Sequence, residues 1–325
     1  NTPGLARIRK LFATGADPRS PELTLVRRSQ GLEKKDLLDL VKQAGVSSLG
    51  ERQKLVNCIV KSRLSFCANA ADEKPNKPKI VCLPGNVANA RTFSVSIAPL
   101  LPKAEHLVHV LEGDELVDEE HHNYELVAVM RKAFPNKDNP EEPLFNFATN
   151  RVEHPESRYD DMDYVLDVLE ARLDLLPFHT HALMGFSAGA AFAIALAARR
   201  QRALSASRGA GSPPPPPQFD CIVLFEAWRP SYRTDLPGLF DEQLRVAALI
   251  VAGEKGFGVS DEVGAGSVAP LFESAPAIVC HPEGHKPLPM EPQGGARVVS
   301  SIVEFVCSHS PVLKAHIDNP FLITR

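Results

Sequence analysis

The stretch His181-Ala-Leu-Met-Gly-Phe-Ser-Ala-Gly-Ala190 joins an apolar run of strand length to a segment that is dense in alanine. Its central residues, 185–189, fit the pattern G-x-S-x-G, which places a serine in a sharp turn between a strand and a helix. The pattern predicts a strand at 181–184 and a helix at 188–203. The turn would expose the hydroxyl of Ser187, because the flanking glycines remove side chains that would clash with the neighbouring strand and helix.

A serine in such a turn has the surroundings of a nucleophile. The amino terminus of the following helix offers backbone N–H groups and the positive end of a dipole to an oxyanion. A histidine has to follow later in the chain, and His281-Pro-Glu-Gly-His285 comes directly after the apolar run 277–280. His285 is the better base of the two histidines, because it lies further along the loop and follows Gly284. The alternative is a surface histidine with no catalytic role.

Apolar runs and helical patterns alternate on both sides of this stretch. Further strands are expected at 80–83, 106–111, 220–225, 247–252 and 277–280, and further helices at 93–101 and about 295–307. Another helix would begin at Asp160 or Asp161 and carry on one face the apolar residues Met162, Val165, Leu166, Leu169, Leu173 and Leu176. The alternation predicts an α/β fold, with a mostly parallel sheet that helices cover on both faces.

Two irregular insertions interrupt the alternation. Residues 205–218, SASRGAGSPPPPPQ, contain five consecutive prolines, which no helix or central strand accommodates, so we expect a surface loop. Residues 112–160 are acidic and rich in proline, and they include His121-His122 and Phe145-Asn-Phe147. A long connection of this kind is either a lid that faces the substrate or a plain insertion.

The net charge of −4 is the sum of a basic N-terminal segment and an acidic remainder. Residues 1–70 contain 13 Lys and Arg against 6 Asp and Glu, whereas the remainder contains 23 against 34. The sign of the balance changes near the polar, proline-containing run 69–78, where we place a linker. The prediction is a basic helical appendage at 1–70 and a main domain at 71–325.

The basic segment carries two short helical patterns within 34–61, separated by Gly45 and Gly50. The stretch 36–61 resembles the C-terminal half of a sterile alpha motif domain and, more weakly, a SAP-type helix-turn-helix. The first resemblance implies a protein partner that docks on 1–70, and the alternative is an appendage that packs on the main domain. Nucleic-acid binding is disfavoured, because few aromatic residues accompany the basic ones.

Composition excludes two classes of protein. An apolar content of 44% can bury a core, which excludes a disordered tail protein, and no run approaches the roughly 18 apolar residues of a membrane-spanning helix. The six cysteines are scattered: Cys58, Cys67, Cys82, Cys221, Cys280 and Cys307. Such spacing is typical of small buried residues in a reducing compartment, so we expect a cytoplasmic protein. The chain begins at Asn1, so an organelle reached after removal of a targeting peptide is the alternative.

Three motifs of the main domain resemble those of one family. Ile80-Val-Cys-Leu-Pro-Gly85 is similar to a first strand and loop written L-C-L-H-G, residues 182–190 to an elbow written G-F-S-Q-G-A, and residues 281–285 to H-x-G-G-H. The family is the FSH family of serine hydrolases, a branch of the α/β-hydrolase superfamily that includes fungal esterases and polyketide-releasing thioesterases. The resemblance spans 79–308 and leaves the appendage outside.

The resemblance implies an α/β-hydrolase domain with Ser187 as the nucleophile and His285 as the general base. It also implies an oxyanion hole formed by the backbone N–H groups of Asn86 and Ala188. The substrate would be a small acyl ester or thioester, which is cleaved through an acyl-enzyme, and no cofactor is implied. Transfer of the acyl group to an acceptor other than water would use the same residues.

The sequence departs from the family pattern at three places. Pro84 replaces the family histidine at the edge of the oxyanion loop, and Ala188 replaces a glutamine after the nucleophile. Where the family has G-x-x-D after the penultimate strand, the chain reads Gly253-Glu-Lys-Gly256, so the expected acid is absent.

An acid is needed to orient the imidazole and to stabilise its charged form. Glu226 follows the expected strand 220–225 and is our first candidate, with a solvated carboxylate paired to Arg229 as its alternative. Glu254 and Asp261 lie near the lost position and are further candidates. Without an acid, the site would be a Ser-His dyad, or the chain would be a noncatalytic subunit of hydrolase fold that docks a partner through its appendage.

Other sites are only weakly indicated. His179 and His181 lie two apart on a strand, and hence on one face, but no carboxylate or cysteine stands at ligand spacing for a metal. Neither G-x-G-x-x-G nor G-x-x-x-x-G-K-[ST] follows a strand, so no phosphate-binding loop is indicated. Trp228 is expected in the core, with a place in a pocket beside Glu226 as the alternative.

Overall fold

The computed structural model describes most of the chain after residue 77. The described residues are 78–113, 115–117, 124–136, 144–147, 165–166, 169–170, 172–173, 176, 178–206, 218–228, 238–255, 264–289 and 291–319. The chain forms two compact units, Asn1–Glu73 with Ala171–Leu175 and Lys74–Glu170 with Leu176–Arg325, and nearly all described residues belong to the second. The expected appendage at 1–70, with its resemblance to a sterile alpha motif, lies outside the described residues.

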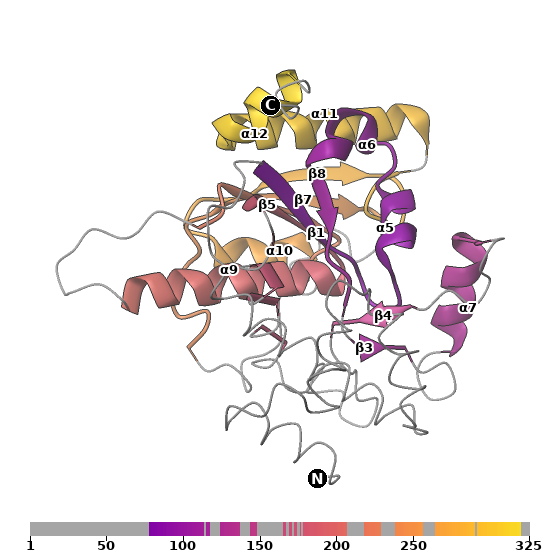
Figure 1. Ribbon diagram of the computed structural model, residues 1–325, viewed down its shortest axis with the longest axis horizontal. Helices are drawn as coiled ribbons and strands as arrows, with labels where there is room; N and C mark the ends of the chain where they lie inside the picture. Colours follow the sequence, from indigo (N-terminus) through magenta and orange to yellow (C-terminus); the bar gives the residue numbers. More distant parts are fainter. Residues whose placement is uncertain are drawn as a thin grey trace, which may run out of the picture. The chain divides into compact units, whose positions relative to one another are not determined.

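Six parallel strands form the central sheet of this unit (Figure 1). They are β1 (Pro78–Leu83), β2 (Val108–Val110), β5 (His179–Phe186), β6 (Cys221–Phe225), β7 (Ala247–Gly253) and β8 (Ala277–His281). Their order is β2-β1-β5-β6-β7-β8, and every neighbouring pair is parallel. Both ends of each strand lie within two residues of the ends expected from the sequence, so the predicted α/β fold is confirmed.

The order of strands reverses direction between β1 and β5. From β1 the chain proceeds outward to β2, whereas from β5 it proceeds in the opposite direction through β6 and β7 to β8. In open α/β sheets, ligands bind outside the carboxyl ends of the strands at such a reversal. The register pairs Leu83 of β1 with Gly185 of β5, so the loop after β1 and the turn at Ser187 both lie at this position.

Helices cover both faces of the sheet. Figure 1 shows α9 (Ala188–Ala206) and α10 (Ala265–Val268) on the side of the sheet opposite to α11 (Pro292–His309). The apolar cluster on the α11 side joins α5 (Ala90–Ser96), α11 and α12 (Pro311–Asp318) to alternate residues of the strands. On the other side α9 packs closely, because a Cβ atom on Gly189 would lie 2.1 Å from the carbonyl oxygen of Leu83.

The helical predictions need two corrections. The pattern at 93–101 predicted one helix, but α5 ends at Ser96, Pro99 lies in the turn that follows, and α6 (Leu101–Ala104) begins with Pro102 in its first turn. Proline has no N–H to donate, so it is tolerated only where a helix starts. The sequence pattern also did not predict α12, which has Ser310 as its N-cap. The Oγ of Ser310 accepts the N–H of Leu313 at 3.3 Å.

Two other predicted elements are described only in part. The helix expected from Asp160 or Asp161 is helical at 165–166, 169–170 and 172–173, and its expected capping residues lie outside the described part. The helix that was expected to end at 203 continues to Ala206, and the remainder of the proline-rich insertion, 207–217, is not described. None of the described helices is both long enough and apolar enough to cross a membrane.

The insertion at 112–160 has more regular structure than its sequence indicated. It contains α7 (Tyr124–Ala133) and a two-stranded antiparallel sheet of β3 (Glu115–Leu116) and β4 (Phe145–Asn146). Strands this short are too brief to show a periodicity in the sequence. Three buried residues of the insertion, Val117, Val127 and Leu144, form a small apolar cluster with Val87 of the loop after β1, and Met130 packs against it.

Candidate active site

Ser187 lies in the turn between β5 and α9 with a left-handed backbone, at a φ of 55°. Its N–H donates to the carbonyl oxygen of Phe225 at 3.0 Å, and its own carbonyl oxygen accepts the N–H of Ala190 at 3.0 Å. A Cβ atom on Gly185 would lie 2.4 Å from the carbonyl oxygen of Gly189, so the strand and the helix approach too closely for a side chain there. The local sequence therefore builds the sharp turn that its glycines predicted.

His285 lies in the loop after β8, with its Nε2 atom 2.9 Å from the Oγ atom of Ser187. Its ring packs against Phe186 with ring centroids 4.9 Å apart, and 38% of its side chain is exposed. His281, the last residue of β8, is fully buried, and its Nε2 lies 3.9 Å from the Oε1 of Glu226. The later histidine of the motif thus meets the serine, while the earlier one lies beside the carboxylate.

Glu226 follows β6 directly and also has a left-handed backbone, at a φ of 49°. Its side chain is fully buried, so the solvated carboxylate considered from the sequence is not what the structure contains. Oε2 lies 3.5 Å from the Nδ1 of His285, and Oε1 accepts the backbone N–H of Gly253. The buried carboxylate thus faces the ring nitrogen of His285 that points away from Ser187.

Gly253, at the end of β7, allows this convergence. A Cβ atom at this position would lie 2.4 Å from the carbonyl oxygen of Gly284 and 2.8 Å from the Oε1 of Glu226. The loop that carries His285 and the carboxylate can therefore come together only because position 253 has no side chain. The chain keeps the glycine of the G-x-x-D pattern although its aspartate is lost.

The other candidate acids are not placed beside the imidazole. Glu254 is exposed, and its backbone N–H donates to the carbonyl oxygen of His281 at 2.9 Å. Asp261 lies outside the described residues, as does Arg229, the partner considered for Glu226. Of the three carboxylates considered from the sequence, Glu226 is the one with a described contact to His285.

Two backbone N–H groups beside Ser187 are directed at no acceptor within the described part of the chain, those of Asn86 and Ala188. Ala188 is the first residue of α9, where an N–H has no carbonyl of a preceding turn to bind. The loop of Asn86 lies against the nucleophile, because a Cβ atom on Gly85 would lie 3.3 Å from the Cβ of Ser187. Pro84 is buried at the edge of this loop in place of the family histidine.

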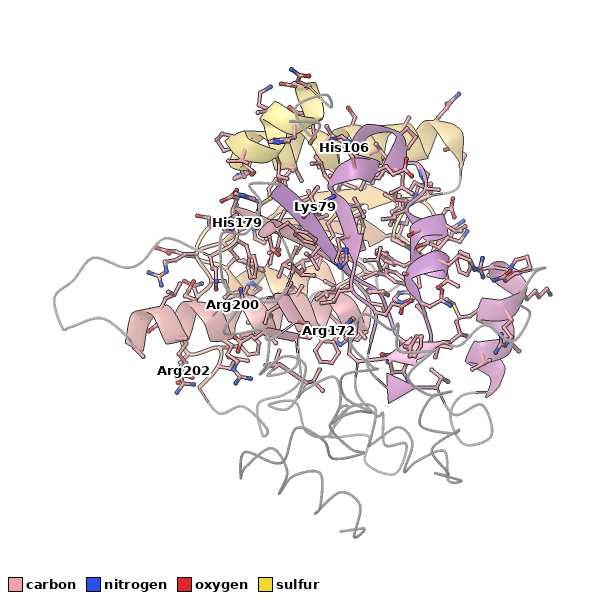
Figure 2. All side chains as sticks on the ribbon, in the orientation of Figure 1. Lys79, His106, Arg172, His179, Arg200 and Arg202 are labelled. Carbon is pink, nitrogen blue, oxygen red and sulfur yellow. The ribbon has the colours of Figure 1, made fainter. Side chains whose placement is uncertain are left out.

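The histidine pair considered for a metal, His179 and His181, lies at the amino end of β5. Figure 2 shows His179 and Lys79 at the amino ends of β5 and β1, and the Nδ1 of His181 lies 2.9 Å from the Oδ2 of Asp220. Within the described ranges, no group of three or more His, Cys, Asp or Glu residues could hold a metal ion. His121-His122 is outside these ranges, and Trp228 is buried.

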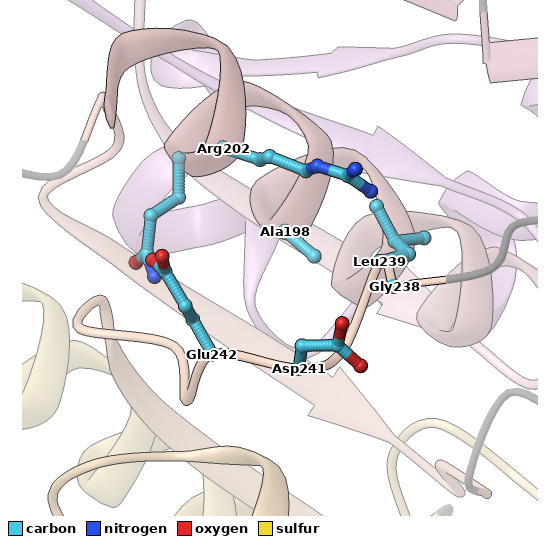
Figure 3. Close-up of a pocket in the computed structure, with 7 residues that line it drawn as sticks. Ala198, Arg202, Gly238, Leu239, Asp241 and Glu242 are labelled. Atoms are coloured by element: carbon cyan, nitrogen blue, oxygen red, sulfur yellow. The ribbon is translucent and has the colours of Figure 1, made fainter. Parts of the chain in front are cut away.

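A cavity of about 140 Å³ opens near the far end of α9 (Figure 3). Its lining residues are Ala198, Gln201, Arg202, Gly238, Leu239, Asp241 and Glu242. At about 1.5 Å per residue of helix, Arg202 lies roughly 20 Å along α9 from Ser187. This cavity is therefore separate from the serine and histidine described above.

Residues 73–292 match the model of the serine hydrolase (FSH1) family. The chain belongs to this family. The match includes every residue of the Ser187 site and confirms the family resemblance read from the main domain. It does not include the appendage at 1–70, and the resemblance of that segment to a sterile alpha motif receives no support.

Several solved hydrolases are similar to this serine hydrolase at low sequence identity. A carboxylesterase from Bacillus cereus is 17% identical with a TM-score of 0.43, over 74% of this chain and 98% of its own. The esterase PE8 is 15% identical with a TM-score of 0.44, over 71% and 93%. A CIB-like hydrolase from Thermoplasma acidophilum is 15% identical with a TM-score of 0.41, over 72% and 88%. No curated protein matches the sequence.

Proposed function

We propose that this serine hydrolase cleaves small carboxylic esters or thioesters through an acyl-enzyme on Ser187. The observation that carries the proposal is the 2.9 Å contact between the Nε2 of His285 and the Oγ of Ser187. A base within hydrogen-bond reach of the hydroxyl that it deprotonates is the first geometric requirement of this chemistry. The sharp turn that exposes the serine supports the same assignment.

The reaction runs in two halves. His285 takes the proton of Ser187 as Oγ attacks the acyl carbon, and the N–H groups of Asn86 and Ala188 donate to the resulting oxyanion. The tetrahedral intermediate then collapses, and the protonated imidazole gives its proton to the leaving alcohol or thiol. Water attacks the acyl-enzyme in the same way, and the acid is released as Ser187 recovers its proton.

Glu226 is the acid of this mechanism. With its carboxylate beside Nδ1, it keeps the proton of the neutral imidazole on that nitrogen and leaves Nε2 free to accept the serine proton. It also stabilises the imidazolium formed during each half of the reaction. Because the carboxylate is fully buried, its attraction for that cation is screened less than at a surface. Its position supports catalysis over the noncatalytic alternative, which was based on the missing aspartate and on Pro84.

Labelling with a fluorophosphonate probe tests the proposal. The wild-type chain should become covalently labelled, and Ser187→Ala should not, because the probe reacts with an activated serine. Ser310→Ala serves as the matched control, since this serine lies at the cap of α12 and should leave labelling unchanged. Labelling that persists in Ser187→Ala, or that is absent from folded wild-type protein, would overturn the proposal.

Hydrolysis assays then distinguish the two ester classes. We expect turnover of p-nitrophenyl butyrate and of the butyryl thioester of N-acetylcysteamine, both lost in Ser187→Ala. The ratio of the two kcat/KM values gives the preference, because both substrates deliver the same acyl group.

A further inference from the structure

Val87, in the loop after β1, has a left-handed backbone at a φ of 56°. A β-branched residue rarely adopts this region, because its side chain crowds the backbone. Such a conformation persists only where the surroundings determine it. The described part of the chain contains two other non-glycine residues of this kind, Ser187 and Glu226, and both belong to the proposed catalytic group.

The insertion supplies the contacts that hold Val87. The Oδ1 of Asn146 in β4 accepts the N–H of Val87 at 2.7 Å, and only 7% of Asn146 is exposed. The next residue, Ala88, exchanges backbone hydrogen bonds with Phe145, at 3.2 Å and 3.0 Å. The side chain of Val87 is 2% exposed and packs in the small apolar cluster with Val127. Backbone and side chain are therefore both fixed from the insertion.

The same short segment also contacts the helix that starts after the nucleophile. The ring of Phe147 lies 5.2 Å from that of Phe192 in α9, and both side chains are buried. Residues 145–147 thus bridge the loop after β1 and the helix after Ser187. The sequence left the insertion as either a lid or a plain insertion. In the structure, residues 145–147 connect the loop after β1 to α9.

The contacts of residues 145–147 determine which backbone N–H of the loop after β1 can donate to the oxyanion. Two amides follow Gly85 in succession, and Asn146 takes up that of Val87. The N–H of Asn86 has no acceptor within the described part, and its loop lies against Ser187. Only the φ and ψ angles of Asn86 separate these two amides, so fixing the peptide plane between Asn86 and Val87 restricts the direction of the Asn86 N–H.

We infer that Asn146 is a positioning residue of the oxyanion hole. By accepting the N–H of Val87, it fixes the peptide plane that follows Asn86 and so aims the N–H of Asn86 at the oxyanion formed on Ser187. The inference rests on the proposed function and extends it, because it makes the insertion a part of the catalytic apparatus. Asn146 itself touches no reacting atom and acts only through the loop.

Kinetics of Asn146→Ala test this role. We expect kcat for a p-nitrophenyl ester to fall by about 100-fold with little change in KM, because a misaimed donor weakens the transition state more than the ground state. The inhibition constant of an alkylboronic acid, whose adduct on Ser187 mimics the tetrahedral intermediate, should rise by a similar factor. Asn146→Asp keeps an acceptor for the N–H of Val87 and should restore most of the rate.

Asn89 offers a matched control. It is 3% exposed, and its Oδ1 accepts the N–H of Thr92 at 2.9 Å as the N-cap of α5. Asn89→Ala loses a comparable buried hydrogen bond, so it should lower the melting temperature without changing kcat or boronate affinity. Asn146→Ser, a smaller change, provides a second variant if Asn146→Ala does not fold.

The outcomes separate this inference from the proposed function. A folded Asn146→Ala variant that keeps wild-type kcat and boronate affinity would overturn the inference while wild-type hydrolysis remains. Equal losses of kcat in Asn146→Ala and Asn89→Ala would also overturn it, because they would indicate a general effect of stability. If the wild-type chain shows no hydrolysis that depends on Ser187, the proposed function fails first and the inference fails with it.

Discussion

A serine, a histidine and a carboxylate meet at each end of the central strands, but their contacts run in a different order. At the carboxyl ends, the imidazole of His285 stands between the hydroxyl of Ser187, at 2.9 Å, and the carboxylate of Glu226, at 3.5 Å. The hydroxyl has a base beside it, and the base has a carboxylate behind it. This is the order that acyl transfer requires.

At the amino ends of β5 and β6, the carboxylate stands in the middle. The Oδ2 of Asp220 lies 2.9 Å from the Nδ1 of His181 and accepts the hydroxyl of Ser310 at 2.6 Å. The proton of Ser310 is therefore directed at a carboxylate and not at an imidazole. The same hydroxyl oxygen accepts the N–H of Leu313, so this group ties α12 to the sheet.

Left-handed backbone conformations also distinguish the two ends of the strands. The non-glycine residues with a left-handed backbone in the described part, Val87, Ser187 and Glu226, all follow the carboxyl ends of strands. Such residues cost on the order of 1–3 kcal/mol each and gather at active sites. The order of contacts and the local strain, and not the residue types, distinguish the proposed catalytic group from the group at the amino ends.

Replacing each of the two serines, Ser187 and Ser310, should give the largest difference in activity between the two ends. Ser187→Ala should lower kcat for a p-nitrophenyl ester by about a millionfold, because the nucleophile is lost. Ser310→Ala should leave kcat unchanged and destabilise the fold by about 1 kcal/mol, because α12 loses its N-cap. Release of p-nitrophenol and thermal unfolding measure the two effects. Equal activity of the two variants would remove the distinction between the ends.

Neutralising the two carboxylates should give the next largest effect. Glu226→Gln should lower kcat by about ten-thousandfold, because the amide no longer stabilises the imidazolium or selects its tautomer. Asp220→Asn should lower the melting temperature through its contacts to His181 and Ser310, with kcat unchanged. Steady-state kinetics with circular dichroism on both variants checks this. A Glu226→Gln variant as active as the wild type would point to a Ser-His dyad.

Adding a methyl group at two glycines tests the close approach at the carboxyl ends. Gly253→Ala should displace the loop of His285 and lower kcat by about 100-fold, because its Cβ would lie 2.4 Å from the carbonyl oxygen of Gly284. Gly238, at a φ of 78°, lines the cavity of Figure 3, and Gly238→Ala should cost about 1–2 kcal/mol of stability without affecting kcat. A Gly253→Ala variant with wild-type kcat would show that the approach is not required.

The smallest effects are expected for the cysteines between the two ends of the strands, whose reactivity depends on burial. Burial raises the pKa of the Cys82 and Cys221 thiols from 9.0 to about 12, and these thiols should resist iodoacetamide in the folded protein. Cys280 and Cys307 are partly exposed, so mass spectrometry should find them alkylated before Cys82 and Cys221. Folding disfavours the buried thiolates, so their contribution to stability is full below pH 9 and is lost as the pH rises towards 12. Early alkylation of Cys82 would contradict this.

The sequence predicted the elements whose signals are local. The strand-turn-helix around Ser187, the six strands and the alternation with helices follow from short apolar runs, glycines and helical spacing. The prediction of one helix at 93–101 was wrong, because Pro99 interrupts the pattern. The helix α7 was missed because it lies within a segment interpreted as an irregular insertion, and β3 and β4 were missed because each has only two residues. The family membership likewise followed from three short motifs.

Only the tertiary structure decided which groups stand behind and beside these motifs. Glu226 was one of several acids in the sequence; the strand order places its β6 between β5 and β7, and the bare backbone of Gly253 lets it face the loop of His285. Asn146 gave no signal at all, because it meets Val87 across 59 residues of chain. Local patterns report backbone preference and burial, whereas the convergence of Ser187 with distant groups depends on register and packing between segments that no spacing in the sequence records.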